Sequence, residues 1–208
     1  MTTSAAQYFH PSNLVTYLSM LAGLLAIFSV KGGGGLSVAG GLIALCSLAD
    51  TLDGKFSRLF KRTEDQKKFG VQLDSLTDAI AFGLAPVISY YLMISFASLT
   101  AHLIWLAAAF FYVISAITRL GVYNIQAEQG LGFIGLPTTV AGLIWSSFFL
   151  MKPSVALSAV LLLGCGTAMV SSIPVPRPGR LGMVAIMGWA LFLMILHGAF
   201  ISIATEQR

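Results

Sequence analysis

Charge is scarce in this chain. Of its 208 residues, 10% are charged and 57% are hydrophobic, whereas roughly a quarter of the residues of a typical soluble domain are charged. The composition therefore excludes an ordinary soluble protein and indicates one that crosses a membrane several times. We expect membrane lipids to surround it and no nucleic acid to be among its partners.

Cysteine is nearly absent. Cys46 and Cys165 stand alone in apolar runs, without a CxxC pair or a nearby histidine, which excludes a metal or redox site built on them. We interpret both as inert thiols of the protein core. We also expect no cleavable signal peptide, because the polar start Met1–His10 has no basic segment ahead of an apolar one.

Long apolar runs, by contrast, fill the chain. A helix of about 20 apolar residues crosses a bilayer, and glycine or proline clusters at Gly32–Gly35, Pro153 and Pro174–Pro178 mark connections between the runs. The sequence predicts an all-α membrane protein, a bundle of six to seven transmembrane helices in one domain over residues 1–208. The segment Ser4–His10 is suited to a short helix in the membrane interface. The predicted spans are Asn13–Val30, Leu36–Phe60, Gly70–Ala97, Ala101–Ile125, Ile134–Met151, Ser154–Ser172 and Leu181–Ala204.

Lysine and arginine are unevenly divided between the ends of these spans. If the turn Phe60–Gly70 is cytoplasmic, most basic residues lie on the cytoplasmic side, as is usual for membrane proteins. We therefore expect this end of the bundle to face the cytoplasm of a bacterial or archaeal cell. The basic residues on that side are Lys55, Arg58, Lys61, Arg62, Lys67, Lys68, Arg119, Arg177 and Arg180, and those outside are Lys31, Lys152 and Arg208.

The few acidic residues are the most informative ones. Half of the eight are Asp50, Asp53, Asp74 and Asp78, in or beside apolar helices, where a carboxylate is costly unless it is paired, metal-bound or in a wet cavity. Residues three or four apart share a helix face, so two such helices side by side would gather four carboxylates. These hard oxygen ligands suit one or two Mg²⁺ or Mn²⁺ ions, which can activate and clamp phosphate groups.

Small and basic residues accompany the carboxylates. Gly54 and Gly70 would let a bulky polar ligand approach the backbone closely, and Arg58 supplies positive charge for a phosphate. Together these residues indicate a metal–diphosphate site. The alternatives are a buried polar network and the cation or proton path of a transporter, which does not need glycines and an arginine in this order.

The two carboxylate pairs lie in a pattern that resembles a family signature. In the CDP-alcohol phosphotransferase family the pattern is D-x2-D-G-x2-A-R, a spacer, and then G-x3-D-x3-D. Ser57 stands here where alanine is usual, and the spacer Leu59–Phe69, which we expect to form the cytoplasmic turn, is longer than usual. The matching positions are Asp50, Asp53, Gly54, Arg58, Gly70, Asp74 and Asp78.

Other segments are similar to the phosphatidylserine synthase branch of this family, so the resemblance covers most of the chain and makes residues 1–208 one such domain. The branch usually has a second arginine where this chain has Val122. This departure bears on which alcohol accepts the group that the enzyme transfers. The similar segments are Pro11–Thr16, Phe69–Asp78, Phe82–Pro86, Arg119–Asn124, Phe133–Pro137 and Met169–Pro174.

This resemblance implies a reaction. CDP-diacylglycerol would donate its phosphatidyl group to the hydroxyl of L-serine, giving phosphatidylserine and CMP. The same transfer to another polar alcohol, such as inositol phosphate, glycerol phosphate or choline, stays open, and a divalent-cation or proton-coupled transporter is the hypothesis from another class. A homodimer is also implied.

The resemblance further implies roles for single residues. Asp50, Asp53 and Asp74 would hold one ion, and Asp50, Asp74 and Asp78 the other, with Asp78 as the catalytic general base. Small residues would lie against CMP, and Asn13 with Thr16 would bind cytidine or ribose. The residues expected to contact CDP-diacylglycerol or CMP are Asn13, Thr16, Asp50, Asp53, Gly54, Ser57, Arg58, Gly70 and Asp74.

Arg119 is the basic side chain inside the spans that lies far from the aspartate motif in sequence. An arginine in an apolar span can extend to the interface and keep its charge in water. It can also bind an anion, here a serine carboxylate or a phosphate. We expect Arg119 to contact the acceptor or the lipid phosphate.

Overall fold

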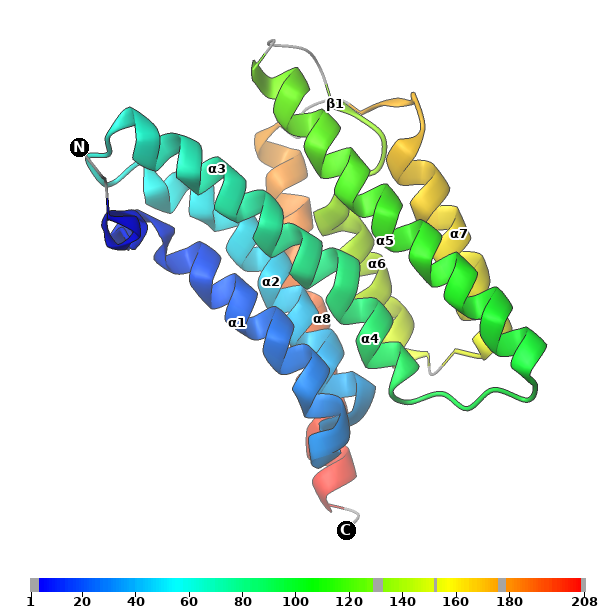
Figure 1. The fold of residues 1–208 in the computed structure, drawn as a ribbon. Coiled ribbons are helices and arrows are strands. Elements are labelled where there is room, and N and C mark those ends of the chain that lie inside the picture. The colour runs from blue at the N-terminus through cyan, green and yellow to red at the C-terminus, as the bar shows by residue number, and fades with distance from the viewer. Residues whose placement is uncertain (1–3, 129–132, 152, 176–178, 207–208) are drawn as a thin grey trace.

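The protein is a bundle of helices that run side by side (Figure 1). The computed structural model describes residues 4–128, 133–151, 153–175 and 179–206. Two short 3-10 turns, Ala5–Tyr8 and Pro11–Asn13, lead into the bundle. The helices are α1 (Leu14–Ser29), α2 (Gly35–Ser57), α3 (Glu64–Asp78), α4 (Ala85–Tyr91), α5 (Leu99–Glu128), α6 (Thr138–Leu150), α7 (Val155–Val170) and α8 (Arg180–Glu206).

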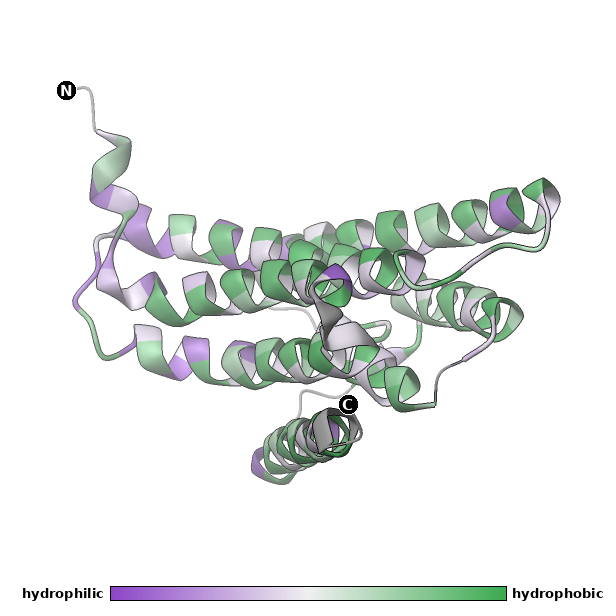
Figure 2. Cartoon of the chain, turned by 90° about the horizontal axis from the view of Figure 1, so that it is seen from below, coloured by the Kyte–Doolittle hydropathy of each residue, from purple (hydrophilic) through white to green (hydrophobic). Residues whose placement is uncertain are grey.

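The helices have the length and composition of membrane spans. Within the residues that the structure describes, five stretches are long and apolar enough to cross a bilayer, and α6 and α7 are shorter apolar helices. Large apolar side chains such as Phe28, Phe110 and Ile195 are exposed on the outside of the bundle, and Figure 2 shows apolar residues along most of its length. An exposed apolar surface of this extent belongs in lipid, so the prediction of an all-α integral membrane protein is confirmed.

The predicted bounds of two spans are wrong: the fifth was expected to begin at Ile134, but α6 begins at Thr138, and the third differs at both ends. The third span was expected at Gly70–Ala97, but the helix begins at Glu64 and runs through α3 and α4 to Tyr91. The second half of the spacer Leu59–Phe69 is therefore helix, and not part of the turn. The Thr63 hydroxyl accepts the Gln66 N–H at 3.2 Å, and the Gln66 side chain accepts the Thr63 N–H at 3.0 Å. This capping box begins a helix within the spacer that we had expected to form the turn. All seven predicted spans overlap their helices.

A π-helical turn, Ala79–Leu84, joins α3 to α4 directly after Asp78. Pro86 has no N–H, so the Phe82 carbonyl four residues earlier lacks its usual helical donor. The buried Tyr112 hydroxyl of α5 donates to this carbonyl at 2.7 Å. The irregular turn is thereby held from a neighbouring helix, and it fixes the end of α3 that carries Asp78.

The start of α6 is held by the segments next to it in space. Strands β1 (Phe133–Ile134) and β2 (Pro174–Val175) form one short antiparallel pair. The Gly135 N–H donates to the Ile173 carbonyl at 3.0 Å, and the Leu136 N–H donates to the Ala168 carbonyl at 2.9 Å. Gly135 has φ of 70°, and a side chain there would overlap the Met169 carbonyl, so this position requires glycine.

Helix α8 is held against α2 and α6 by a buried polar contact. The Ser146 hydroxyl of α6 donates to the Gly40 carbonyl of α2 at 2.8 Å and lies 3.2 Å from Nε2 of His197 in α8. His197 is fully buried. Because α8 forms one wall of a cavity described below, this contact fixes that wall.

Candidate active site

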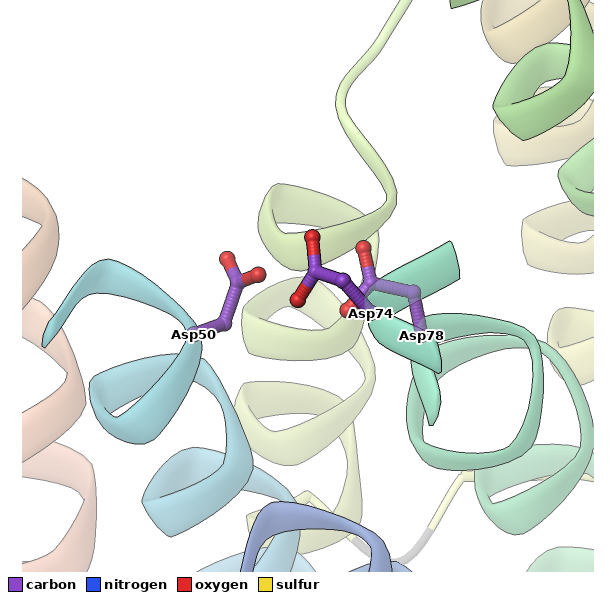
Figure 3. A group of neighbouring side chains, drawn as sticks. All are labelled: Asp50, Asp74 and Asp78. Atoms are coloured by element: carbon purple, nitrogen blue, oxygen red, sulfur yellow. The ribbon is translucent and has the colours of Figure 1, made fainter. Parts of the chain in front are cut away.

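Three carboxylates converge inside the bundle. Asp50 comes from α2 and Asp74 and Asp78 from α3, and each offers an oxygen that lies within 4.8 Å of the other two. Figure 3 shows the three side chains pointing toward one another. Asp78 is almost fully buried, with 8% of its surface exposed. We call these three residues the aspartate triad.

The fourth predicted ligand, Asp53, lies beside the triad. It follows Asp50 by three residues, a rise of about 4.5 Å along α2, and is not part of the group of mutually close oxygens. The Thr16 hydroxyl of α1 donates to Asp53 Oδ2 at 3.3 Å. The structure therefore brings three of the predicted carboxylates into one group and places Asp53 on the side toward α1.

Two cavities flank the triad, and Asp74 lines both. The cavity toward α1 has a volume of about 290 Å³, and we call it the α1-side cavity. It is lined by Ser12, Asn13, Thr16, Asp53, Gly54, Ser57, Arg58, Arg62, Lys67, Gly70, Val71 and Asp74. The cavity toward α5, of about 350 Å³, is the α5-side cavity. It is lined by Asp50, Thr51, Asp74, Ser75, Asp78, Arg119, Leu120, Tyr123, Pro137, Thr139, Val140, Val175, Met183 and Ile186.

The α1-side cavity gathers the residues expected to contact the donor, apart from Asp50, which lines the other cavity. It also contains Arg62 and Lys67, which were not among the residues expected to contact the donor. Their position close before Gly70 in the spacer was the signal available for them. Three basic side chains, those of Arg58, Arg62 and Lys67, therefore line this cavity.

Arg119 reaches the α5-side cavity, which also contains all three triad residues. Its guanidinium carbon lies 5.3 Å from the centre of the Tyr123 ring, within the range of a cation–π contact. Its Nε is buried and has no hydrogen-bond partner among the described residues. The structure thus places this arginine at the carboxylates, although they are distant in sequence.

Two hydroxyls contact the triad from α6. The Thr139 hydroxyl donates to Asp50 Oδ2 at 2.7 Å, and the Thr138 hydroxyl donates to Asp78 Oδ2 at 3.4 Å. Sequence reasoning missed both residues. They follow Pro137 at the end of a segment that resembles the synthase branch, and this was the only signal for them.

The triad fits a divalent cation. Within the part of the chain that the structure describes, no lysine or arginine forms an ion pair with these three carboxylates. Three unpaired carboxylates at this depth would be costly, and a bound cation offsets that cost. Oxygen ligands alone are the set that Mg²⁺ and Mn²⁺ prefer, so Asp50, Asp74 and Asp78 are suited to hold such an ion.

Comparison with known proteins identifies the family of this chain. The profile of the CDP-alcohol phosphatidyltransferase family matches residues 9–205. The chain is 34% identical over 171 residues to the archaetidylserine synthase of Methanothermobacter thermautotrophicus, covering 82% of this chain and 71% of that protein. It is 30% identical over 203 residues to the CDP-diacylglycerol–serine O-phosphatidyltransferase of Methanocaldococcus jannaschii (91% and 90% covered). It is also 30% identical over 208 residues to the Helicobacter pylori enzyme of that name (94% and 81%). The chain belongs to the CDP-alcohol phosphatidyltransferase family and is a membrane-embedded transferase.

Proposed function

We propose that the protein transfers the phosphatidyl group of CDP-diacylglycerol to the hydroxyl of L-serine and releases CMP. The names of its relatives support serine as the acceptor. The observation that carries the proposal is the position of the triad between two cavities that share Asp74. A transferase that joins two substrates needs a binding space on each side of its reacting centre.

The α1-side cavity is the proposed donor site. Arg58, Arg62 and Lys67 supply positive charge for the diphosphate, and Asn13 and Thr16 supply polar groups for the cytidine or ribose. Ser57, Gly54 and Gly70 would lie against CMP. A divalent ion held by the triad, Mg²⁺ or Mn²⁺, would neutralise the diphosphate and stabilise the departing CMP oxygen. Asp53 lies close enough to Asp74 to line the same cavity and is the candidate ligand for a second ion.

The α5-side cavity is the proposed acceptor site. Asp78 lines this cavity and not the donor cavity, so its carboxylate is placed to take the proton from the serine hydroxyl. The serine oxygen then forms a bond to phosphorus as the bond from phosphorus to the CMP oxygen breaks. Arg119 in the same cavity would bind the carboxylate of serine or the lipid phosphate.

The test is CMP release by the purified chain in detergent with CDP-diacylglycerol and Mg²⁺ or Mn²⁺. CMP is expected to appear with L-serine and not with inositol phosphate, glycerol phosphate or choline. Release with one of these alcohols instead would identify that alcohol as the acceptor and leave the type of reaction unchanged. If none of the alcohols causes CMP release, the proposed function is contradicted. The alternative is then a cation or proton transporter, which the family relationship does not favour.

Arg119→Ala is expected to lower kcat/KM for serine by about 10- to 150-fold, because a charge-assisted hydrogen bond of roughly 1.5–3 kcal/mol is lost. A raised KM for serine alone would identify the serine carboxylate as the partner, and a raised KM for the donor alone would identify the lipid phosphate. Arg119→Lys should restore activity only in part if the contact is bidentate. Wild-type kinetics in Arg119→Ala would contradict the assignment.

Gly54→Ala is expected to weaken donor binding without harming the fold. A side chain at Gly54 would meet no protein atom within 4 Å, and Gly54 lines the donor cavity. Alanine in a helix is about 0.5–1 kcal/mol more stable than glycine, so the variant should unfold at the same or a higher temperature while its KM for CDP-diacylglycerol rises. Gly188→Ala in α8, also open around the added methyl group, is the control, and an unchanged donor KM in Gly54→Ala would contradict the prediction.

We further propose that the site faces the cytoplasm of a bacterial or archaeal cell. The α2–α3 connection and the start of α8, at Arg180, lie at the end of the bundle where α1 begins, while the α1–α2 connection lies toward the other end (Figure 1). Lys31 belongs to the α1–α2 connection, in the turn Val30–Gly34. Lys152, Arg177 and Arg208 lie outside the described residues. The excess of basic residues at the first end supports this orientation. The homodimer stays a prediction from the resemblance.

A further inference from the structure

We propose that the two threonines at the start of α6 are positioning residues. Their hydroxyls would hold two of the three triad carboxylates in the orientation that a divalent ion needs. The contacts are Thr139 to Asp50, at 2.7 Å, and Thr138 to Asp78, at 3.4 Å. The inference rests on the metal-binding part of the proposed function and adds residues that belong neither to the aspartate motif nor to its helices.

The geometry explains how one helix end reaches two others. Consecutive residues of a helix point about 100° apart, so Thr138 and Thr139 extend toward different neighbours, one toward α3 and the other toward α2. Figure 3 shows α6 directly beside the three carboxylates. The start of α6 therefore sets the separation between a carboxylate of α2 and one of α3, which their own helices do not fix.

The position of the threonines in the first turn leaves their hydroxyls available. A threonine inside a helix commonly donates to the carbonyl four residues earlier, as Thr51 does to Ser47 at 2.9 Å. For Thr139 that residue is Gly135, which precedes the helix and has a left-handed backbone. The N-cap is Pro137, which forms no side-chain cap, and the hydroxyls of Thr138 and Thr139 contact Asp78 and Asp50.

The start of α6 is also fixed in space, as a positioning element must be. The backbone hydrogen bonds of Gly135 and Leu136 to the end of α7 and the residues after it hold the segment before α6. The Ser47 hydroxyl of α2 lies 3.4 Å from the Thr139 carbonyl. Thr138 is fully buried, so its side chain is enclosed by the surrounding helices.

The experiment measures Mn²⁺ binding to the purified full-length protein without substrate, from the electron paramagnetic resonance signal of free Mn²⁺. Removing a residue that orients a metal ligand commonly costs about 10- to 100-fold in metal affinity, so Thr139→Val should raise the Kd for Mn²⁺ by about that factor. Thr138→Val should have a smaller effect, because its contact is longer. Thr139→Ser, which retains the hydroxyl, should bind Mn²⁺ nearly as the wild type does.

Thr77→Val is the matched control. Thr77 is buried next to Asp78 in sequence, but its hydroxyl has no partner among the described residues, so its loss should leave Mn²⁺ affinity unchanged. If Thr139→Val does not fold, Thr139→Ala removes the same hydroxyl with less bulk and must also weaken Mn²⁺ binding. Wild-type affinity in the Thr139→Val or Thr139→Ala protein overturns the inference, as does a Thr139→Ser protein as weak as Thr139→Val. Serine-dependent CMP release by the wild type tests the proposed function separately, and a wild type that binds no Mn²⁺ overturns the inference together with the metal site.

Discussion

Asp78→Asn is expected to lower turnover by about 10²-fold or more while CDP-diacylglycerol still binds. Of the two cavities, Asp78 lines only the α5-side cavity, and it is almost fully buried. It can therefore serve as the base for an acceptor hydroxyl without touching the donor cavity. Asparagine keeps the size of the side chain and can still accept the hydrogen bond from Thr138. It cannot accept a proton, and that step should fail.

The measurement is the rate of CMP release at saturating Mn²⁺, so that a weaker metal site does not lower the rate, together with donor binding in the absence of serine. Asp65→Asn is the control, because Asp65 is an exposed acid in the first turn of the same helix. Near-normal turnover in Asp78→Asn at saturating metal would show that another group takes the proton. Loss of donor binding would show that Asp78 acts chiefly through the metal.

Asp74→Asn should abolish metal binding and donor binding together. Asp74 is the triad member that lines both cavities, so its carboxylate is shared by the metal site and the donor site. Loss of a direct ligand should exceed the roughly 100-fold that marks the upper range for supporting residues. We therefore expect more than about a 100-fold rise in the Kd for Mn²⁺ and no serine-dependent CMP release.

Asp53→Asn provides the comparison for this prediction. Asp53 lies outside the triad and contacts Thr16. Its loss should therefore weaken binding of the donor more than binding of the first Mn²⁺ ion. Both proteins would be titrated with Mn²⁺ under the same conditions. If Asp53→Asn loses Mn²⁺ as completely as Asp74→Asn does, the four aspartates form one metal site and the separation seen between them is not functional.

Properties that depend on neighbours in sequence could be predicted from the sequence. The seven apolar segments follow from local composition, since each helix satisfies its own backbone hydrogen bonds and needs only apolar side chains to lie in lipid. The two aspartate pairs follow from helix periodicity. The beginning of α3 was also encoded locally, in the capping box of Thr63 and Gln66, but the whole spacer Leu59–Phe69 had been expected to form the turn.

Contacts between helices were decided only by the tertiary structure. Spacing along α2 and α3 shows which carboxylates share a face, but not which of them meet across the two helices, where Asp50 joins Asp74 and Asp78 and Asp53 lies toward Thr16. Thr138 and Thr139 reach the site because α7 and a strand pair hold the start of α6. Arg119 reaches it because α5 forms a wall of the cavity. The sequence alone determined the fold class and the type of chemistry, since both follow from residue type and local spacing. The packing of α5, α6 and α8 around α2 and α3 determined which side chains meet there, because contacts between distant residues depend on how helices pack and not on sequence spacing.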